Sequence, residues 1–430
     1  MNTYSSYKDS GIEWIGEIPS EWDSLKLKYI FSEKPITHNT ELNCGSISFG
    51  RVVFKDNDKV PISTKKSYQE VLEGEYLINP LNLNYDLKSL RIGLSDIDVV
   101  VSSGYIVIKN RIEISKSYYK WLLHIYDILH MKLLGSGVRQ TISFNHISNS
   151  ILTYPPLHEQ QQISDYLDYK TLKIDTLIEK TQQKIELLKE QRTSLINTTV
   201  TKGLDPNVEM KDSGVEWIGK IPSEWNTISL RYYLIRVGSG STPRGGGDVY
   251  SDNGIPFLRS QNVHFDGLHL EGVVFISEEI HQNMNNTIVK HGDVLLNITG
   301  GSIGRSCVVD THEEMNVNQH VSILRTKESL INFYLNYCLV SSIGQEQVDY
   351  NQTGGNREGL SSDNIKNFKF VLPPLQEQQQ IVDYINKKTS KIDKLVDIES
   401  KRIILLKEYR QSLISDVVTG KVDVRDEVLV

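Results

Sequence analysis

The feature that most constrains the fold is an internal repeat that spans the chain. The segment YKDSGIEWIGEIPSEW at Tyr7–Trp22 returns as MKDSGVEWIGKIPSEW at Met210–Trp225, an offset of 203 residues. A second segment, PPLHEQQQISDYLDYKTLKIDTLIEK from Pro155, returns in similar form from Pro373, an offset of 218 residues. Because a repeat fixes architecture before any assignment of secondary structure, the sequence predicts two copies of one unit. The second copy is longer by the difference, 15 residues.

The middle regions of the two copies, roughly Asp23–Ile142 and Asn226–Leu360, have little sequence in common. A duplicated enzyme is expected to repeat its catalytic residues. A protein that recognises two different ligands is expected to keep its scaffold and to change the regions that contact the ligands. The repeat therefore indicates a bipartite recognition protein. The middles are expected to be α/β mixtures, with strands at Ser46–Phe54, Val99–Val107, Gly272–Ile276, Asp293–Ile298 and Val321–Arg325 and helices at Tyr118–Leu134 and Ser329–Tyr350.

Each copy ends in a predicted long helix with a heptad seam. The seam positions are Ile174, Ile178, Thr181, Ile185, Leu188, Arg192 and Leu195, and then Ile392, Val396, Glu399, Ile403, Leu406, Arg410 and Leu413. Each helix has about 45 residues and a length of about 65 Å. Since a helix with an apolar stripe needs a partner, we expect the two helices to pair with each other. A coiled coil between separate chains is the alternative.

A register for this pair follows from the polar seam positions. In an antiparallel arrangement with two-fold symmetry, one register places apolar seam residues opposite each other. It also places Arg192 opposite Glu399 and Thr181 opposite Arg410. A shift of one heptad puts the arginines opposite Leu or Ile, which is costly in a partly buried seam. We therefore predict an Arg192–Glu399 ion pair that fixes the register more than it adds stability.

The composition excludes several classes of protein. The net charge of −7 argues against a uniformly basic coat for nucleic acid. Asp23–Thr153 has about 16 basic and 13 acidic residues and Asn226–Val371 about 11 and 15, so any DNA-facing charge is local. Three widely spaced cysteines give no disulfide framework. With no signal peptide and no long apolar run, we expect a cytoplasmic protein without a membrane segment.

Candidate DNA-contacting residues lie in glycine-containing loops. The loop before the first helix supplies Ser136, Arg139 and Gln140, and the loop before the second supplies Asn356 and Arg357. Glycine lets the backbone approach DNA, and arginine offers a planar pair of donors to a phosphate or a guanine edge. An ordinary surface loop is the alternative. The second middle adds Arg244, Arg259, Gln261 and Asn262, whose side-chain types can make paired hydrogen bonds to bases, and also Arg305.

Other motifs give no sign of catalysis. The tryptophans of WIGxIPxxW, at Trp14–Trp22 and Trp217–Trp225, are expected to anchor a turn in both copies, with stacking on bases as the alternative. The segment TGGSIGR lacks the pattern of a phosphate-binding loop, and no zinc-protease or hydrolase motif occurs. The eleven histidines show no metal-ligand spacing, so no metal site and no catalytic residue are expected.

Taken together, the duplicated WIGxIPxxW segment, the duplicated PPLxEQQQI helix start and the divergent middles resemble the specificity subunits of type I restriction-modification systems. The resemblance implies an α/β (α+β) protein with two target-recognition domains, a pair of long antiparallel coiled-coil helices and an internal pseudo-two-fold repeat. The expected parts are residues 1–22 (repeat segment), 23–153 (first recognition domain), 154–203 (first spacer helix), 204–225 (linker and second repeat segment), 226–371 (second recognition domain), 372–420 (second spacer helix) and 421–430 (a C-terminal segment near the N-terminus).

The same resemblance implies the partners. The chain is expected to bind double-stranded DNA with a bipartite, asymmetric target, and to scaffold two methyltransferase (M) subunits and two motor-nuclease (R) subunits. These partners use S-adenosylmethionine, ATP and Mg²⁺, and the chain itself is expected to bind no cofactor and to catalyse nothing. The alternative is a coiled-coil adaptor whose two variable domains bind proteins.

Overall fold

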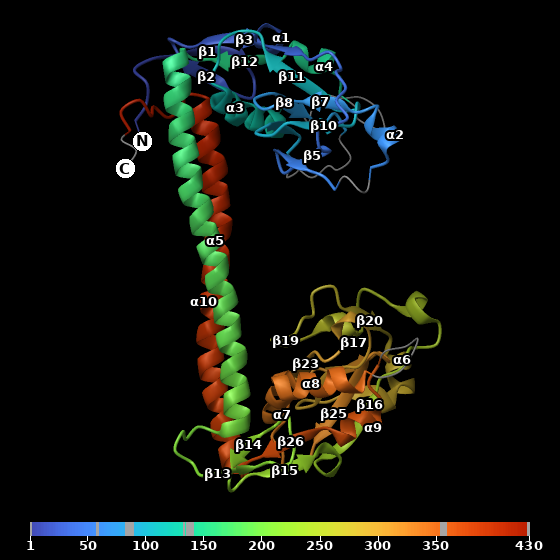
Figure 1. The fold of residues 1–430 in the computed structure, drawn as a ribbon. Helices are drawn as coiled ribbons and strands as arrows, with labels where there is room; N and C mark the ends of the chain where they lie inside the picture. Colours follow the sequence, from blue (N-terminus) through green and yellow to red (C-terminus); the bar gives the residue numbers. More distant parts are fainter. Residues whose placement is uncertain are drawn as a thin grey trace. The chain divides into compact units, whose positions relative to one another are not determined.

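The computed structural model describes residues 2–56, 60–81, 90–131, 134, 142–352 and 359–427. The chain divides into two compact units. Unit 1 comprises Met1–Thr181 and Lys401–Val430, and unit 2 comprises Gln182–Ser400. Each unit holds one mixed α/β middle domain together with one part of each long helix (Figure 1). The predicted fold class is thereby confirmed.

The long helices are α5 (Leu157–Lys202) and α10 (Leu375–Val418), which have 46 and 44 residues. Each begins after a Pro-Pro pair and is followed by a glycine with positive φ, Gly203 at 75° and Gly420 at 77°. A Cβ on Gly420 would lie 2.4 Å from Pro19 Cδ, so any larger residue would push the N-terminal repeat segment away. Glycine is therefore needed here both to end the helix and to let the chain pack closely.

The pairing of α5 and α10 is antiparallel, but its register differs from the prediction. In unit 2, Arg192 Nε donates to Asp393 Oδ1 over 3.0 Å, and Lys184 Nζ lies 2.5 Å from Glu399 Oε1. The predicted Arg192–Glu399 ion pair is therefore wrong. The partner of Arg192 lies about one heptad from the expected position.

Unit 1 contains the symmetry-related pair. Arg410 Nε and Nη2 donate to the two carboxylate oxygens of Asp175 over 2.8 and 3.1 Å. Thr181, the predicted partner of Arg410, instead donates its hydroxyl to Leu177 O in its own helix over 2.7 Å. The register differs from the prediction because the arginine side chain is long. An arginine that lies opposite an isoleucine of the seam still reaches the aspartate beside that isoleucine, at the edge of the seam.

The first middle domain starts and ends with two paired strands. Strand β3 (Asp23–Lys26) pairs antiparallel with β12 (Ile151–Tyr154). Between them lies a four-stranded antiparallel sheet in the order β4-β11-β8-β9, with the smaller pairs β5-β6 and β10-β7. The remaining elements are α1 (Leu27–Ile30), β4 (Phe31–Glu33), β5 (Gly45–Ser48), β6 (Arg51–Phe54), α2 (Ile62–Lys65), β7 (Gln69–Val71), β8 (Tyr76–Ile78), β9 (Ile92–Leu94), β10 (Val99–Val101), β11 (Ile106–Asn110), α3 (Lys116–Leu129) and α4 (Phe144–Ser148).

The second middle domain has the same plan despite its different sequence. Strand β15 (Asn226–Ser229) pairs with β26 (Lys369–Leu372), and the main sheet has the order β16-β25-β22-β23. A second sheet has the order β20-β17-β24-β21. The elements are β16 (Leu234–Ser239), β17 (Ile255–Leu258), β18 (Val263–His264), β19 (Gly267–Leu268), β20 (Val274–Ile276), α6 (Glu278–Asn283), β21 (Ile288–Val289), β22 (Val294–Asn297), β23 (Ser306–Val308), β24 (Met315–Val317), β25 (Val321–Thr326), α7 (Asn332–Val340), α8 (Ser342–Asn351) and α9 (Ser362–Asn367).

Two tyrosines and two glutamines attach the middle domains to the helices. In unit 1, Tyr118 donates its hydroxyl to Val418 O over 3.1 Å, and in unit 2 Tyr334 does the same to Val200 O over 3.2 Å. Gln160 and Gln378, from the repeated EQQQ segment, accept the backbone N–H at the start of α3 and α7, both over 2.9 Å. The repeated segments thus form the joint, which explains why they are alike in both copies.

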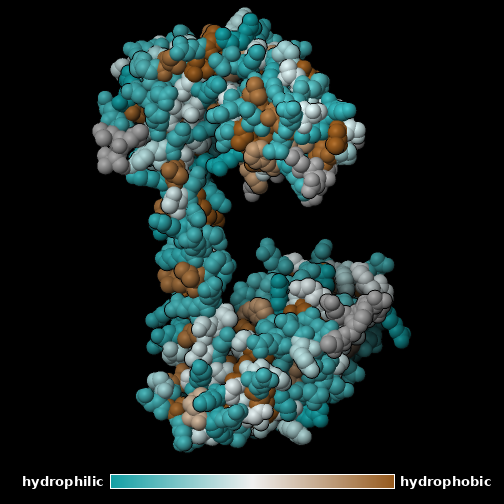
Figure 2. All heavy atoms as spheres, in the orientation of Figure 1, coloured by the Kyte–Doolittle hydropathy of each residue, from teal (hydrophilic) through white to brown (hydrophobic). Residues whose placement is uncertain are grey.

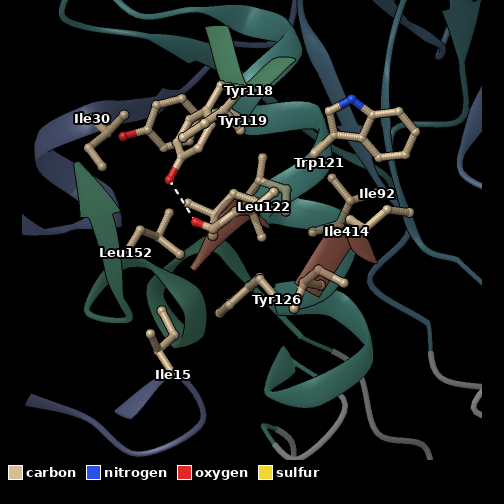
Figure 3. Packing of buried hydrophobic residues seen from close by; sticks show 14 of the residues in the cluster. Ile15, Ile30, Ile92, Tyr118, Tyr119, Trp121, Leu122, Tyr126, Leu152 and Ile414 are labelled. Atoms are coloured by element: carbon tan, nitrogen blue, oxygen red, sulfur yellow. Dashed lines mark hydrogen bonds between the residues drawn. The ribbon is translucent and has the colours of Figure 1, made fainter. Parts of the chain in front are cut away.

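Apolar packing reinforces the joint in unit 1. Tyr118, Leu122 and Tyr126 of α3 pack in one cluster with Ile414 of α10 and with Leu152 (Figure 3). All five side chains are buried. Burial of this kind contributes about 25 cal/mol per Å² of apolar surface, so this packing stabilises the attachment of the domain to the helices.

The repeat segments are β1 (Tyr7–Ile12) with β2 (Gly16–Pro19), and β13 (Met210–Asp212) with β14 (Lys220–Pro222). Their last tryptophans are buried, Trp22 at 0% and Trp225 at 1% exposure, and Trp225 Nε1 donates to Glu377 Oε2 over 2.8 Å. These two rings are anchors and are not free to stack on bases. In unit 1, Asn2 and Asp423 form an antiparallel bridge between the N-terminal and C-terminal segments.

No helix among the described residues is both long and apolar enough to cross a membrane.

Candidate nucleic-acid interface

Five loops of unit 2 meet at one edge of its sheets. They are residues 240–244 after β16, 259–262 after β17, 298–305 after β22, 318–320 before β25, and 359–361 before α9. We call this set the loop edge. The antiparallel order β16-β25-β22-β23 places the end of one strand beside the start of the next, so these connections lie together.

Backbone hydrogen bonds hold the loop edge together. Gly240 N donates to Val321 O over 2.9 Å, and Ile298 N to His320 O over 3.0 Å. Leu360 N donates in turn to Ile298 O over 2.9 Å. A Cβ on Gly240 would lie 2.0 Å from Val317 O, so only glycine allows this close approach. The loops are therefore fixed relative to one another by the sheet edges that carry them.

Polar side chains link the same loops. The buried Asn297 donates to Ser260 O over 2.8 Å and to Ser302 Oγ over 3.1 Å. Thr299 Oγ1 lies 2.5 Å from His320 Nδ1, and Thr242 donates to Gln319 Oε1 over 2.5 Å. A network of this kind holds loops from distant parts of the sequence in one arrangement, as a recognition surface requires.

Four of the predicted DNA-contacting residues lie on this edge. Arg244 and Gln261 are exposed, and Arg259 and Arg305 are half-buried. Arg259 Nε is buried and has no hydrogen-bond partner among the described residues. Because an unsatisfied buried donor is unfavourable, a phosphate or a guanine edge placed here would supply the missing acceptor. The three segments that carry these residues are separated in the sequence, and the topology brings them together.

Asn262 departs from its predicted role. It is only 1% exposed, its Oδ1 accepts the N–H of Arg259 over 2.9 Å and its Nδ2 donates to His269 O over 2.8 Å. Both ends of the amide are thus committed to the loop. The structure therefore assigns Asn262 to holding Arg259 and Gln261 in place, which argues against contact with a base.

The other predicted residues, Ser136, Arg139 and Gln140 of the first copy and Asn356 and Arg357 of the second, lie outside the described residues. Thr299 and Gly359 form an antiparallel bridge at the loop edge, and in unit 1 Ile142 N donates to Pro80 O over 3.0 Å. The residues remain predictions.

Unit 1 has a feature that the sequence did not predict. The turn between β5 and β6 consists of Phe49 at φ 48° and Gly50 at φ 75°, and Phe49 is 83% exposed. Positive φ at a bulky residue is uncommon outside two-residue hairpin turns. The hairpin lies close to its neighbours, since a Cβ on Gly93 would be 2.8 Å from Gly50 O. The Phe-Gly pair was the sequence signal for this turn, but a single strand was predicted over Ser46–Phe54.

Two arginines are committed to the interior. Arg325 makes two hydrogen bonds of 2.7 Å to Asp293, which is 1% exposed, and the hydrogen bond to Asp293 raises the pKa of Arg325. Arg91 Nε donates to the buried Asp127 over 3.1 Å. These two arginines are engaged by buried carboxylates, so they are not offered to a ligand.

Comparison with known proteins fits this geometry. Residues 19–187 and 222–408 each match the family described as type I restriction modification DNA specificity domain. The chain belongs to this family. The two matches cover both middle domains and the first part of each long helix, up to residues 187 and 408.

Relatives of known type share this assignment. The chain is 23% identical to the MjaVIII specificity subunit of Methanocaldococcus jannaschii over 420 residues, 95% of each chain. It is 23% identical to the EcoBI specificity subunit of Escherichia coli over 291 residues, 65% of this chain and 60% of that one. The fold resembles the HsdS subunit of Thermoanaerobacter tengcongensis, with a TM-score of 0.51 over 94% of this chain and 98% of that one. A solved chain from a study of type I R-M complex assembly gives a TM-score of 0.65 over 94% and 99%.

Proposed function

We propose that this chain is the sequence-reading subunit of a type I restriction-modification complex. Each middle domain reads one half of a split target in double-stranded DNA, and the two halves differ, which makes the target asymmetric. The observation that carries the proposal is the loop edge, where Arg244, Arg259, Gln261 and Arg305 converge on a rigid frame. Arginine and glutamine at fixed positions are suited to phosphates and base edges.

Different readers on one frame also support two different half-sites. The main sheets of the two middle domains have the same strand order, yet the loops at their edges differ. Unit 1 carries the Phe49 turn between β5 and β6, whereas unit 2 carries a longer segment with the β18-β19 hairpin between β17 and β20. A common frame fixes the approach to DNA, and different loops select different bases.

Two M subunits are proposed to dock on the long helices. Several large apolar residues off the seam are exposed there: Leu172, Ile404, Leu405 and Tyr409 in unit 1, and Leu187, Leu395 and Ile398 in unit 2. Leu187 and Leu405 are related by the 218-residue repeat. The helix surface shows such apolar patches between hydrophilic side chains (Figure 2). Exposed apolar patches on a helix are typical of protein contacts.

The chemistry is assigned to these partners. The M subunits supply S-adenosylmethionine for adenine methylation, and two R subunits supply the motor and nuclease with ATP and Mg²⁺. The chain itself is proposed to catalyse no step, and the complex to work in the cytoplasm. Its contribution is to place the M subunits at two half-sites at a distance set by α5 and α10.

The test is the methylation pattern that the chain confers. It is expressed with its M partner in a host without other adenine methylation, and methylated bases are mapped across the genome. The expected result is one split motif with two different halves. Replacement of residues 23–142 by the equivalent part of another family member should change one half alone. A continuous motif, or a change in both halves, would contradict the proposal.

A further inference from the structure

A group of three possible metal ligands lies on the β18-β19 hairpin of unit 2. His264, Asp266 and His269 each offer one ligand atom, and these atoms lie within 4.8 Å of one another. The imidazole rings of His264 and His269 are 4.0 Å apart at an interplanar angle of 16°, and His269 Nε2 is 3.1 Å from Asp266 Oδ1. The turn of the hairpin thus brings together residues whose H-x-D-x-x-H spacing gave no metal-site prediction.

Backbone groups hold the two histidines in place. His264 Nε2 lies 2.8 Å from Gln261 O, so a neutral imidazole donates there and leaves the Nδ1 lone pair free. A backbone carbonyl that accepts the second ring N–H is the usual support for a metal-binding histidine. His269 is fixed by two bonds to the buried Asn262, from its N–H over 2.9 Å and to its carbonyl over 2.8 Å.

A second pair of stacked histidines lies in unit 2 without a carboxylate ligand beside it in the described part of the chain. His291 and His312 stack at 4.1 Å and 22°, in the same middle domain. Among the described residues, however, only the hairpin group joins two histidines to a carboxylate within ligand distance. The two pairs therefore form a matched comparison, in which stacking is shared and the third ligand is not.

We propose that His264, Asp266 and His269 bind a divalent transition metal ion, with Zn²⁺ as the best match. Two imidazoles and one carboxylate favour zinc over Mg²⁺ or Ca²⁺, which prefer oxygen ligands. Asp266 and His269 are exposed and His264 is half-buried, so the ion is reached from solvent and water completes its coordination. The role is structural: the ion closes the hairpin and fixes Gln261, which accepts from His264.

The experiment titrates the full chain, purified with its M partner and freed of metal, with Zn²⁺ alone in a calorimeter. Co²⁺ replaces Zn²⁺ in a second titration that follows its visible absorption. The variants are His264→Gln/His269→Gln, the milder Asp266→Asn, and the control His291→Gln/His312→Gln. We expect one bound ion per chain in the wild type and the control. Affinity should fall by more than about tenfold in the hairpin variants.

Two results would overturn the proposal. One is a wild-type chain that binds no Zn²⁺ in a one-to-one ratio. The other is equal binding by the wild type, Asp266→Asn and the double hairpin variant. Because the readout is metal binding and not DNA binding, failure here leaves the recognition function untouched. A failure of DNA recognition would likewise leave the metal site standing.

Discussion

Gln261 and Asn262 are neighbours in one loop, but Gln261 is exposed whereas Asn262 is buried. Asn262→Ala removes two hydrogen bonds and leaves the N–H of Arg259 and the carbonyl of His269 without their partner. Each lost bond in a buried position is worth about 1 kcal/mol, so we expect the free energy of unfolding to fall by about 2–3 kcal/mol. Gln261→Ala removes an exposed side chain, and its effect on stability should stay within about 0.5 kcal/mol.

For DNA binding, we expect Gln261→Ala to have the larger effect on base discrimination. If Gln261 contacts a base, its loss removes about 1–3 kcal/mol of discrimination at one position of the second half-site. Urea unfolding measures the first effect. Fluorescence anisotropy of the complex with M subunits, on a duplex that carries the methylated motif, measures the second. These two roles are refuted if Asn262→Ala is as stable as wild type, or if Gln261→Ala binds every single-base variant of the target as the wild type does.

Substitutions at three other positions test the folded state, the first half-site and the helix pair. Burial lowers the pKa of His124 from its usual 6.5 to about 4, so between these pH values the unfolded chain takes up a proton that the folded chain does not. The free energy of unfolding should therefore fall by about 3 kcal/mol as the pH drops through this window. His124→Gln should reduce this pH dependence, which urea unfolding at pH 7 and pH 4.5 measures. If the Phe49 ring stacks on a base, Phe49→Ala should weaken binding to the first half-site by about 1–3 kcal/mol, as measured by fluorescence anisotropy. The control is Phe54→Ala, at a phenylalanine that is 57% exposed, and it should have little effect. Arg410→Asp should destabilise unit 1, and the added change Asp175→Arg should recover about 0.5–1 kcal/mol in a double-mutant cycle; additive effects would argue against the observed register.

The sequence predicted the large elements well because repetition and heptad spacing are strong signals. The two helices of 46 and 44 residues agree with the expected 45 or so. The predicted helix register was wrong because it was based on the seam positions alone. Asp175 and Asp393 lie one residue beside the seam, and long arginine side chains reach them. Partners outside the seam are settled by three-dimensional reach, which a linear pattern does not contain.

The middle domains show where sequence reasoning reaches its limit. Their common strand order was hidden because β8 and β22 share only an apolar character, and strand order depends on pairing between distant segments. Arg244, Arg259 and Arg305 were chosen by residue type, and the topology gathers them at one edge. Asparagine is a residue type that contacts bases, so the sequence could not exclude this role for Asn262. Only its burial shows that the side chain holds the loop together.

The paired strands at the base of each middle domain have a consequence for how specificity changes. In β3-β12 and in β15-β26, the chain enters and leaves the domain through two adjacent antiparallel strands. The strands lie next to segments that are nearly identical in the two copies. Recombination between genes at these shared segments therefore transfers a whole reader without breaking its sheets. A new target then arises in one genetic step, and the helices and their partners are unchanged.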